Sequence, residues 1–231
     1  MPGGDQAREI LVKTLVIAPH PDDETIGCGG TLLRLKAEGS RLAWMIVTEI
    51  SEAAGWNANV VKRRCTEIQS VAKMVGFDRV FELGFPAAGL DVVPGRELVS
   101  AFGDVFREFQ PEQVFVPNRS DVHTDHRLVF DAAAACSKWF RYASVKRVLA
   151  YETVSETDFA LDSESAFQPN YYVDIEHFLS RKLEIMSVYG SEIGRPPFPR
   201  SIENVKALAL VRGSSSGFVA AEAFKLLRER L

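Results

Sequence analysis

The stretch Lys13–Glu24 reads KTLVIAPHPDDE, an apolar run that ends in two prolines, a histidine and three carboxylates. Residues 13–18 have the length and composition of a buried strand. In an open α/β sheet, ligands bind outside the carboxyl ends of the strands, where loops present side chains from a rigid scaffold. The stretch therefore predicts the first strand of a sheet and a polar site at its end.

Apolar runs of strand length alternate with longer amphipathic segments along the first two thirds of the chain. The other expected strands are residues 41–48, 79–83, 113–117 and 145–152. Apolar side chains recur at helical spacing in residues 30–38, 60–75 and 95–109. Gly39 and Gly76 stand where a left-handed residue commonly ends a helix. This alternation predicts an α/β fold with helices around a mainly parallel sheet.

The last third of the chain has a less regular pattern. Residues 153–169 are rich in Ser, Glu and Asp and are expected to form a loop, whereas 176–189 and 220–231 are expected to be helical. Residues 190–200 contain three prolines, which prevent a continuous helix because proline lacks an N–H donor, and this segment is a candidate lid. A chain of 231 residues, 46% of them hydrophobic, fits one domain spanning residues 1–231.

Charge and composition argue against several classes of protein. The formal net charge is −4, so the chain lacks the strongly basic balance typical of nucleic-acid binding. No apolar run approaches the roughly 20 residues that span a bilayer, and residues 1–8 lack the apolar core of a secretory signal. The three cysteines, Cys28, Cys65 and Cys136, are too widely spaced for a zinc cluster. We expect them to be small buried thiols in a reducing cytoplasm.

The histidine and carboxylates of residues 20–24 are of the types that bind zinc. A catalytic zinc uses three such protein ligands and leaves the fourth position to water. His20 and Asp23 could supply two ligands, which leaves Asp22 free to accept a proton from metal-bound water. A divalent ion would also offset the repulsion among the neighbouring carboxylates. The alternative is that these acids only complement the N-terminus of a following helix.

A second polar cluster follows the apolar run at 113–117. Residues 118–126 read NRSDVHTDH, and a third ligand could come from them. If His126 binds the metal, His123 can stabilise the oxyanion or donate a proton to the leaving amine, and Asp125 could fix the tautomer of one of these imidazoles. The alternative is a polar loop that caps a helix beginning near Asp125. Two such clusters, each at the end of an expected strand, favour a metal site.

Three glycines, Gly27, Gly29 and Gly30, follow the first cluster. Residues without a Cβ let the backbone approach a sheet or a substrate closely. The spacing GCGGTL at 27–32 does not complete the pattern G-x-G-x-x-G, and the preceding acids would repel a pyrophosphate. The sequence therefore disfavours a nicotinamide-dependent enzyme.

These motifs resemble those of a known family. HPDDE at 20–24, GCGG at 27–30 and HTDH at 123–126 are similar to the LmbE-like/PIG-L family of zinc-dependent N-acetylglucosaminyl deacetylases. Further similar motifs are RCTE at 64–67, RSIE at 200–203 and AEAF at 221–224. The resemblance thus extends nearly end to end, and its HPDDE and HTDH motifs are the specific ones.

The resemblance implies a single Rossmann-like domain, a three-layer sandwich with a mainly parallel sheet. It implies that the metal ligands are His20, Asp23 and His126. It also implies that Asp22 is the general base, that His123 is the oxyanion-stabilising or acid residue, and that Asp125 is the partner of His123.

The implied activity is removal of the acetyl group from an N-acetylated amino sugar or its conjugate, by attack of zinc-bound water on the acetamide carbonyl. Mixed His and carboxylate ligands suit Zn²⁺ and do not exclude another divalent ion such as Fe²⁺. The partner is then a small N-acetylated sugar or glycoconjugate. The sequence does not indicate whether the chain forms a homo-oligomer, although related proteins are often oligomeric. The alternatives are a metal-dependent esterase or phosphoesterase, and an idle sugar-binding module, against which the intact Asp22 stands.

Three further residues are weaker candidates. Arg64 is a candidate substrate-binding residue because a guanidinium can clamp a hydroxyl or a phosphate, although a solvated helix face beside Lys62 and Arg63 is the alternative. Trp56 and Phe85 are expected in loops at the catalytic edge, where they could stack on a sugar ring. No loop motif identifies the particular sugar.

Overall fold

Seven strands form one sheet in the structure, a computed structural model that describes residues 12–161, 164 and 166–231. The strands are β1 Lys13–Ala18, β2 Arg41–Glu49, β3 Arg79–Pro86, β4 Gln113–Pro117, β5 Arg147–Tyr151, β6 Tyr171–Asp174 and β7 Ala221–Glu229. Their order across the sheet is β3-β2-β1-β4-β5-β7-β6. Strands β1 to β5 run parallel, and β7 is antiparallel to both β5 and β6. The expected mainly parallel sheet is confirmed.

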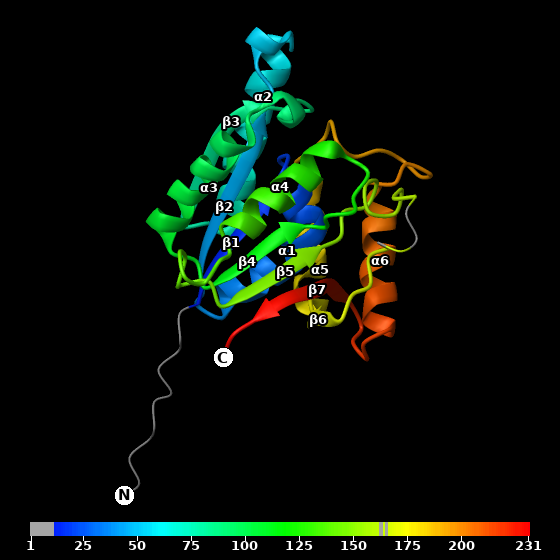
Figure 1. Cartoon of the computed structure of the whole chain (residues 1–231). Helices are drawn as coiled ribbons and strands as arrows, with labels where there is room; N and C mark the ends of the chain where they lie inside the picture. Colours follow the sequence, from blue (N-terminus) through cyan, green and yellow to red (C-terminus); the bar gives the residue numbers. More distant parts are fainter. Residues whose placement is uncertain (1–11, 162–163, 165) are drawn as a thin grey trace, which may run out of the picture.

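Helices cover both faces of this sheet (Figure 1). They are α1 Asp23–Ala37, α2 Ala58–Val75, α3 Gly95–Phe109, α4 Thr124–Ala135, α5 Leu179–Met186 and α6 Ile202–Ser214. Short 3-10 turns are η1 Glu52–Ala54, η2 Leu90–Val92 and η3 Glu176–Phe178. Alternate side chains of β1 pack on opposite faces: Leu15 and Ile17 pack in the core formed with α3 and α4, and Val16 in the core formed with α1, α2 and α5. The expected three-layer α/β sandwich is therefore confirmed.

The order of the strands determines where the loops meet. From β1 the chain builds β2 and β3 on one side and then returns to place β4 and β5 on the other. The direction of the order changes between β1 and β4, and ligands of open α/β sheets bind at such a switch point. The two polar clusters lie directly after β1 and β4.

The helix predicted for residues 220–231 is wrong. Most of residues 220–231 form the strand β7, which pairs with β5 and β6. Alanine, glutamate, leucine and arginine favour helix locally, but the pairing with two strands overrides that preference. The buried end of β7 carries Glu222, whose carboxylate accepts the N–H groups of Gly30 at 2.8 Å and Thr31 at 2.7 Å.

Smaller differences concern boundaries and exposure. Helix α1 begins at Asp23 rather than Gly30, so all three glycines lie inside it. A Cβ on Gly27 would stand 2.3 Å from the Tyr151 ring, which explains why this position requires glycine. Helix α6 and strand β6 were not expected. Phe85 lies in β3 rather than in a loop, and residues 176–189 begin with the turn η3 before α5.

The cysteines are free, and Cys65 is exposed, contrary to expectation, because it lies on an outward face of α2, whereas Cys28 and Cys136 are buried. Within the described ranges, no helix combines the length and apolar character needed to cross a membrane. The expectation for residues 1–8 falls outside the described residues.

Candidate metal centre

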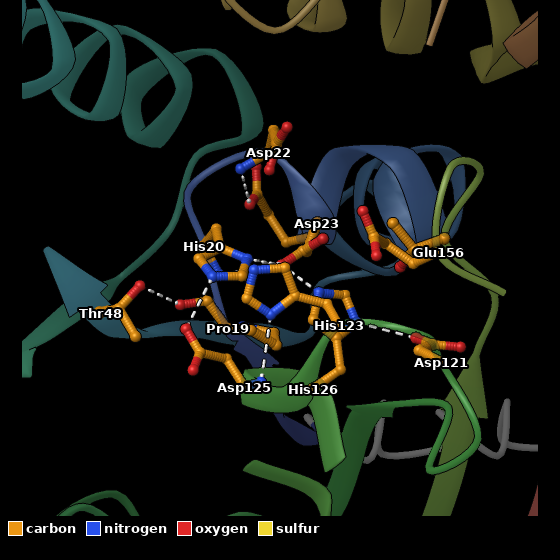
Figure 2. Close-up of polar contacts among 12 residues, drawn as sticks. Pro19, His20, Asp22, Asp23, Thr48, Asp121, His123, Asp125, His126 and Glu156 are labelled. Carbon is orange, nitrogen blue, oxygen red and sulfur yellow. Dashed lines mark hydrogen bonds and ion pairs between the residues drawn. The ribbon is translucent and has the colours of Figure 1, made fainter. Parts of the chain in front are cut away.

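The three expected ligands come together at the carboxyl ends of β1 and β4 (Figure 2). His20 lies in the loop after β1, Asp23 is the first residue of α1, and His126 lies in the first turn of α4. Nδ1 of His20 and Nε2 of His126 each lie 3.4 Å from Oδ2 of Asp23. One ligand atom from each residue lies within 4.8 Å of the other two, which is close enough for one ion to bind all three.

The His126 imidazole is held ready to bind a cation. Its Nδ1 lies 2.8 Å from Oδ2 of Asp121, so the carboxylate accepts the Nδ1 proton, and Nε2 is the nitrogen that can bind a cation once its own proton is displaced. That Nε2 is buried and has no hydrogen-bond partner among the described residues, and His126 is 1% exposed. Buried polar atoms in native proteins are almost always paired. A metal ion would satisfy this one.

A second carboxylate orients His20. Nε2 of His20 lies 3.1 Å from Oδ2 of Asp125, which leaves Nδ1 facing Asp23. Asp125 is fully buried and also accepts the backbone N–H of Ala88 at 2.8 Å and of Leu90 at 3.2 Å. We expected Asp125 to be the partner of His123, but its carboxylate contacts His20, because the first turn of α4 directs it beneath the β1 loop.

The charges of the site also fit a cation. Burial lowers the pKa of His20, but the Asp125 hydrogen bond and the neighbouring Asp23 outweigh burial and raise it to about 9. Burial likewise lowers the pKa of His126, but the charge of Asp23 and the Asp121 hydrogen bond raise it to about 10. Without a metal, the carboxylates therefore hold protons on both imidazoles. A divalent ion would supply the positive charge that these protons supply in its absence.

A second grouping of possible ligands, His20, His123 and Asp125, is less suitable. The Asp125 carboxylate already binds His20 and two backbone N–H groups. This carboxylate is thus already in use, whereas Nε2 of His126 makes no hydrogen bond to any described residue.

Asp22 adopts a strained conformation beside the ligands. Its φ is 142°, a region that residues other than glycine rarely occupy, and such strain persists where the surroundings impose it. Here Glu24 accepts the Asp22 N–H at 3.1 Å and the Tyr189 hydroxyl proton at 2.7 Å. Burial, and then the charge of Asp23, raise the pKa of the Asp22 carboxyl well above its usual range. Its Oδ2 lacks a hydrogen-bond partner in the described part of the chain and lies 3.6 Å from Nη1 of Arg200.

His123 caps the N-terminus of α4. Its Nδ1 accepts the backbone N–H of Asp125 at 3.1 Å, so a neutral imidazole carries its proton on Nε2. Burial, and then the charge of His20, lower the pKa of His123, which favours this neutral form. The rings of His20 and His123 lie 4.6 Å apart, which places a hydrogen-bond donor next to the ligands.

Arg64 is bound by the protein itself. Its guanidinium donates to the Pro21 carbonyl at 2.8 Å and to Glu192, and Nε lies 3.4 Å from Glu67. These contacts hold the loop that carries Asp22. The role of Arg64 in substrate binding stays a prediction.

Sequence reasoning did not identify two further residues. Asp121, five positions before His126, orients that histidine, and its other oxygen accepts protons from Asn118 at 3.1 Å and Thr157 at 2.7 Å. Glu156 lies in the loop after β5 and faces the site in Figure 2. The sequence signal for Asp121 was its place in the same polar loop, whereas nothing local distinguished Glu156 from its Ser- and Glu-rich surroundings.

One cavity of about 790 Å³ is lined by His20, Asp22, Asp23, His123, His126 and Glu156. Its walls come from the loops after β1, β2 and β4, from α2, and from the segment at 191–200. The volume lies within the range of pockets that hold small ligands, roughly 300–1,000 Å³. The arrangement can therefore hold a divalent ion and, beside it, a small organic molecule.

The chain is similar in sequence to one protein family and to several known deacetylases, and similar in structure to solved proteins. Residues 15–137, more than half of the chain, match the model of the family PIG-L, described as GlcNAc-PI de-N-acetylase. The diacetylchitobiose deacetylase of Thermococcus kodakarensis is 26% identical over 229 residues, covering 93% of this chain and 83% of that protein. The 2'-N-acetylparomamine deacetylase of Streptomyces fradiae is 27% identical over 213 residues, covering 78% and 73%. Among solved structures, a conserved protein of Thermus thermophilus has a TM-score of 0.77 at 28% identity, covering 95% of this chain and 96% of that one.

Proposed function

The chain belongs to the PIG-L family, and from that premise we propose that it is a metal-dependent hydrolase that removes the acetyl group from an N-acetylated amino sugar or its conjugate. The single observation that carries the proposal is the buried Nε2 of His126, which has no hydrogen-bond partner among the described residues and lies 3.4 Å from Oδ2 of Asp23 in a cavity of ligand size. Two relatives, each described as a deacetylase of an N-acetylated sugar compound, support the substrate class.

We propose that His20, Asp23 and His126 hold the ion and that it is Zn²⁺, because two imidazoles and a carboxylate form a typical catalytic zinc set. Fe²⁺ and other divalent ions accept the same ligands. A divalent ion bound there would polarise the acetamide carbonyl and lower the pKa of a water molecule.

The protein residues then have distinct parts in the reaction. Asp22 takes the proton of the attacking water, and its raised pKa lets the carboxyl keep that proton until the leaving amine needs it. Neutral His123 donates from Nε2 to the carbonyl oxygen as negative charge develops there. Asp121 and Asp125 act through the histidines that they orient. The products are acetate and a free amine.

The setting of the enzyme is also a proposal. We propose that it acts on a small soluble substrate in the cytoplasm, where its three free cysteines stay reduced. Assembly into a homo-oligomer stays a prediction.

The test is an assay of purified protein with a panel of N-acetylated sugars, esters and phosphoesters. Acetate and free amine should appear in equal amounts from at least one N-acetylglucosamine derivative. Release of phosphate or alcohol, with no amine from any acetamide, would instead support an esterase or phosphoesterase. Binding without turnover of any compound would support an idle sugar-binding module.

A further inference from the structure

Glu156 is a carboxylate of the cavity wall that has no part in the reaction proposed above. It lies in the loop after β5 and lines the cavity together with His123 and His126, and Figure 2 shows it facing the ligands. Its Oε1 accepts the Ser155 hydroxyl proton at 3.2 Å, whereas Oε2 makes no hydrogen bond to any described residue. At least one oxygen of Glu156 is therefore available to a molecule in the cavity.

The turn that carries Glu156 is attached to the loop after β4. The backbone N–H of Val122, the neighbour of His123, donates to the Glu156 carbonyl at 3.2 Å. The hydroxyl of Thr157 donates at 2.7 Å to Asp121, the carboxylate that orients His126. Both contacts use groups other than the Glu156 carboxylate. They therefore place Glu156 beside the candidate metal centre and leave its side chain directed into the cavity.

The residue before Glu156 has a strained backbone. The φ of Ser155 is 80°, a region that residues other than glycine rarely occupy. The turn around it is closed by two hydrogen bonds to the Thr153 carbonyl, from the backbone N–H of Glu156 at 3.1 Å and from that of Thr157 at 2.8 Å. Strain of this kind persists where the surroundings impose it, and it is common at active sites. The turn thus holds Glu156 in one position at the cavity wall.

The other carboxylates of the cavity have partners or lie on its opposite side. Asp23 is a proposed ligand, Asp22 is the proposed base, and Glu192 binds Arg64. Strands β2 and β3 lie on one side of β1, whereas β4 and β5 lie on the other. The three remaining carboxylates of the cavity belong to β2, η1 and β3; they are Glu49, Glu52 and Glu82. Glu156 is therefore the cavity carboxylate that faces the ligands from the β5 side.

An acetamide has two polar groups that need partners in the cavity. In the proposed reaction, its carbonyl oxygen lies beside the metal ligands and His123, which donates to it. Its N–H is a donor, and a buried donor without an acceptor is costly. His123 cannot serve, because its Nε2 carries a proton in the neutral form. Glu156 can supply the acceptor from the adjoining wall.

We propose that Glu156 accepts the N–H of the acetamide, so that it positions the substrate and favours an amide over an ester. The proposal rests on the proposed deacetylase function for the position of the carbonyl group. When the C–N bond breaks, its electron pair stays on the nitrogen, which takes the proton held by Asp22. The N–H that Glu156 accepts then belongs to an increasingly positive atom, and the hydrogen bond strengthens. An ester has an oxygen in place of the N–H and offers no proton to Glu156.

The experiment compares two acetylated sugars that differ only at the reacting group. One is the methyl glycoside of N-acetylglucosamine, and the other is methyl glucoside with an O-acetyl group at the same carbon. We expect Glu156→Ala to lower the kcat/KM for acetate release from the acetamide by about 10- to 100-fold, the size of a hydrogen bond to a charged group. The kcat/KM for the ester should stay the same or rise. A merely structural role of Glu156 would lower both values alike.

Two further variants sharpen the comparison. Glu156→Gln keeps an acceptor oxygen and should retain part of the activity that Glu156→Ala loses on the acetamide. The matched control is Asp158→Ala, which removes an exposed carboxylate from the same loop, outside the cavity, and should leave the ratio of the two kcat/KM values unchanged. Metal content should be equal in all these proteins, because the Glu156 carboxylate bonds only to Ser155 among the described residues.

Calorimetric binding of both sugars provides a readout that does not depend on turnover. The wild-type protein should bind the acetamide more tightly than the ester, and Glu156→Ala should remove this difference. If the ester is bound but not hydrolysed, its inhibition constant replaces its kcat/KM and should be the same in the wild-type protein and in Glu156→Ala.

The possible results separate the two proposals. Equal losses for the acetamide and the ester in Glu156→Ala, or no loss for either, would overturn the role of Glu156 and leave the deacetylase function in place. If the wild-type protein hydrolyses no acetamide, the deacetylase function fails, and the calorimetry decides on Glu156. Tighter binding of the acetamide that Glu156→Ala abolishes would then support the contact with the N–H, and equal affinities for the two sugars would overturn it.

Discussion

Asp22 and Asp23 are neighbours in the sequence but face different partners. Asp23 lies between the two imidazoles, whereas Oδ2 of Asp22 makes no hydrogen bond to any described residue and has Arg200 3.6 Å away. We expect Asp22→Asn to lower kcat by about 10²- to 10⁴-fold, the usual cost of removing a general base, with the metal content almost unchanged. Asp23→Asn should lose most of the metal. Metal analysis beside steady-state kinetics checks both, and equal, mild effects of the two substitutions would contradict their separate roles.

Metal binding should depend on pH through the histidine ligands. The carboxylates outweigh burial and raise the pKa of His20 to about 9 and that of His126 to about 10. Both rings therefore carry an extra proton at neutral pH, and an incoming ion must displace it. We expect about two protons to be released per ion at pH 7 and the affinity to weaken as the pH falls. Calorimetric titrations in two buffers of different ionisation enthalpy measure this release. Identical heats in both buffers would show that no proton is displaced.

Asp121 should matter for the metal although it does not touch it. Its carboxylate fixes the His126 tautomer that exposes Nε2. Removing such a partner typically weakens metal binding by about 10- to 100-fold, and we expect this of Asp121→Asn. Competition with a chelator measures the affinity. The control Asp131→Asn removes an exposed carboxylate that pairs with Arg119, and it should have no effect. Equal metal affinities of the two variants would show that Asp121 does not support metal binding.

At the scale of elements, the strand β7 holds helix α1 in place. Glu222 binds Nζ of Lys182 at 2.7 Å and two backbone N–H groups of α1, and both side chains are buried. Lys182 donates in turn to the Ile26 carbonyl at 2.7 Å. The buried ion pair thus binds backbone groups of α1 from both β7 and α5. The helix whose first residue is Asp23 is thereby fixed against the sheet.

Breaking the ion pair between Glu222 and Lys182 should lower the free energy of unfolding. Glu222→Ala leaves the buried Lys182 charge without its carboxylate partner, and such changes lower the free energy of unfolding by about 3 to 5 kcal/mol. The control Glu229→Ala lies on the same strand and removes a partly exposed pair with Arg147, which should cost about 0 to 1 kcal/mol. Denaturant unfolding measures both values. Similar losses for the two variants would mean that the buried pair contributes no more than an exposed one.

The same elements show what a sequence can predict. The strand at 13–18 was predictable because its pattern is local in the chain, and two local motifs were enough to predict that His20, Asp23 and His126, the proposed ligands, lie close together. Strand β7 was not, since its composition favours helix and only pairing with β5 and β6 makes it a strand.

The positions of charged partners were equally hidden. Arg64 pairs with Glu192, which lies 128 residues away in the chain, so no local pattern indicated that its guanidinium is in use. Asp125 stands beside His123 and His126 in the sequence. Because the loops after β1 and β4 lie side by side, its carboxylate contacts His20 instead. Contacts of this kind depend on how the whole sheet is assembled.

At the scale of the whole molecule, the mainly parallel sheet brings two loops together at its switch point, so that the three candidate metal ligands lie in one cavity. The central claim is that this centre performs the hydrolysis. The most direct measurement removes metal from the purified protein with a chelator and titrates Zn²⁺ back while amine release from an N-acetylglucosamine derivative is followed. The account predicts that activity is lost with the metal and returns in proportion to added ion up to one equivalent per chain. Amine release that persists in the metal-free protein, or that returns equally in His126→Ala, would contradict it.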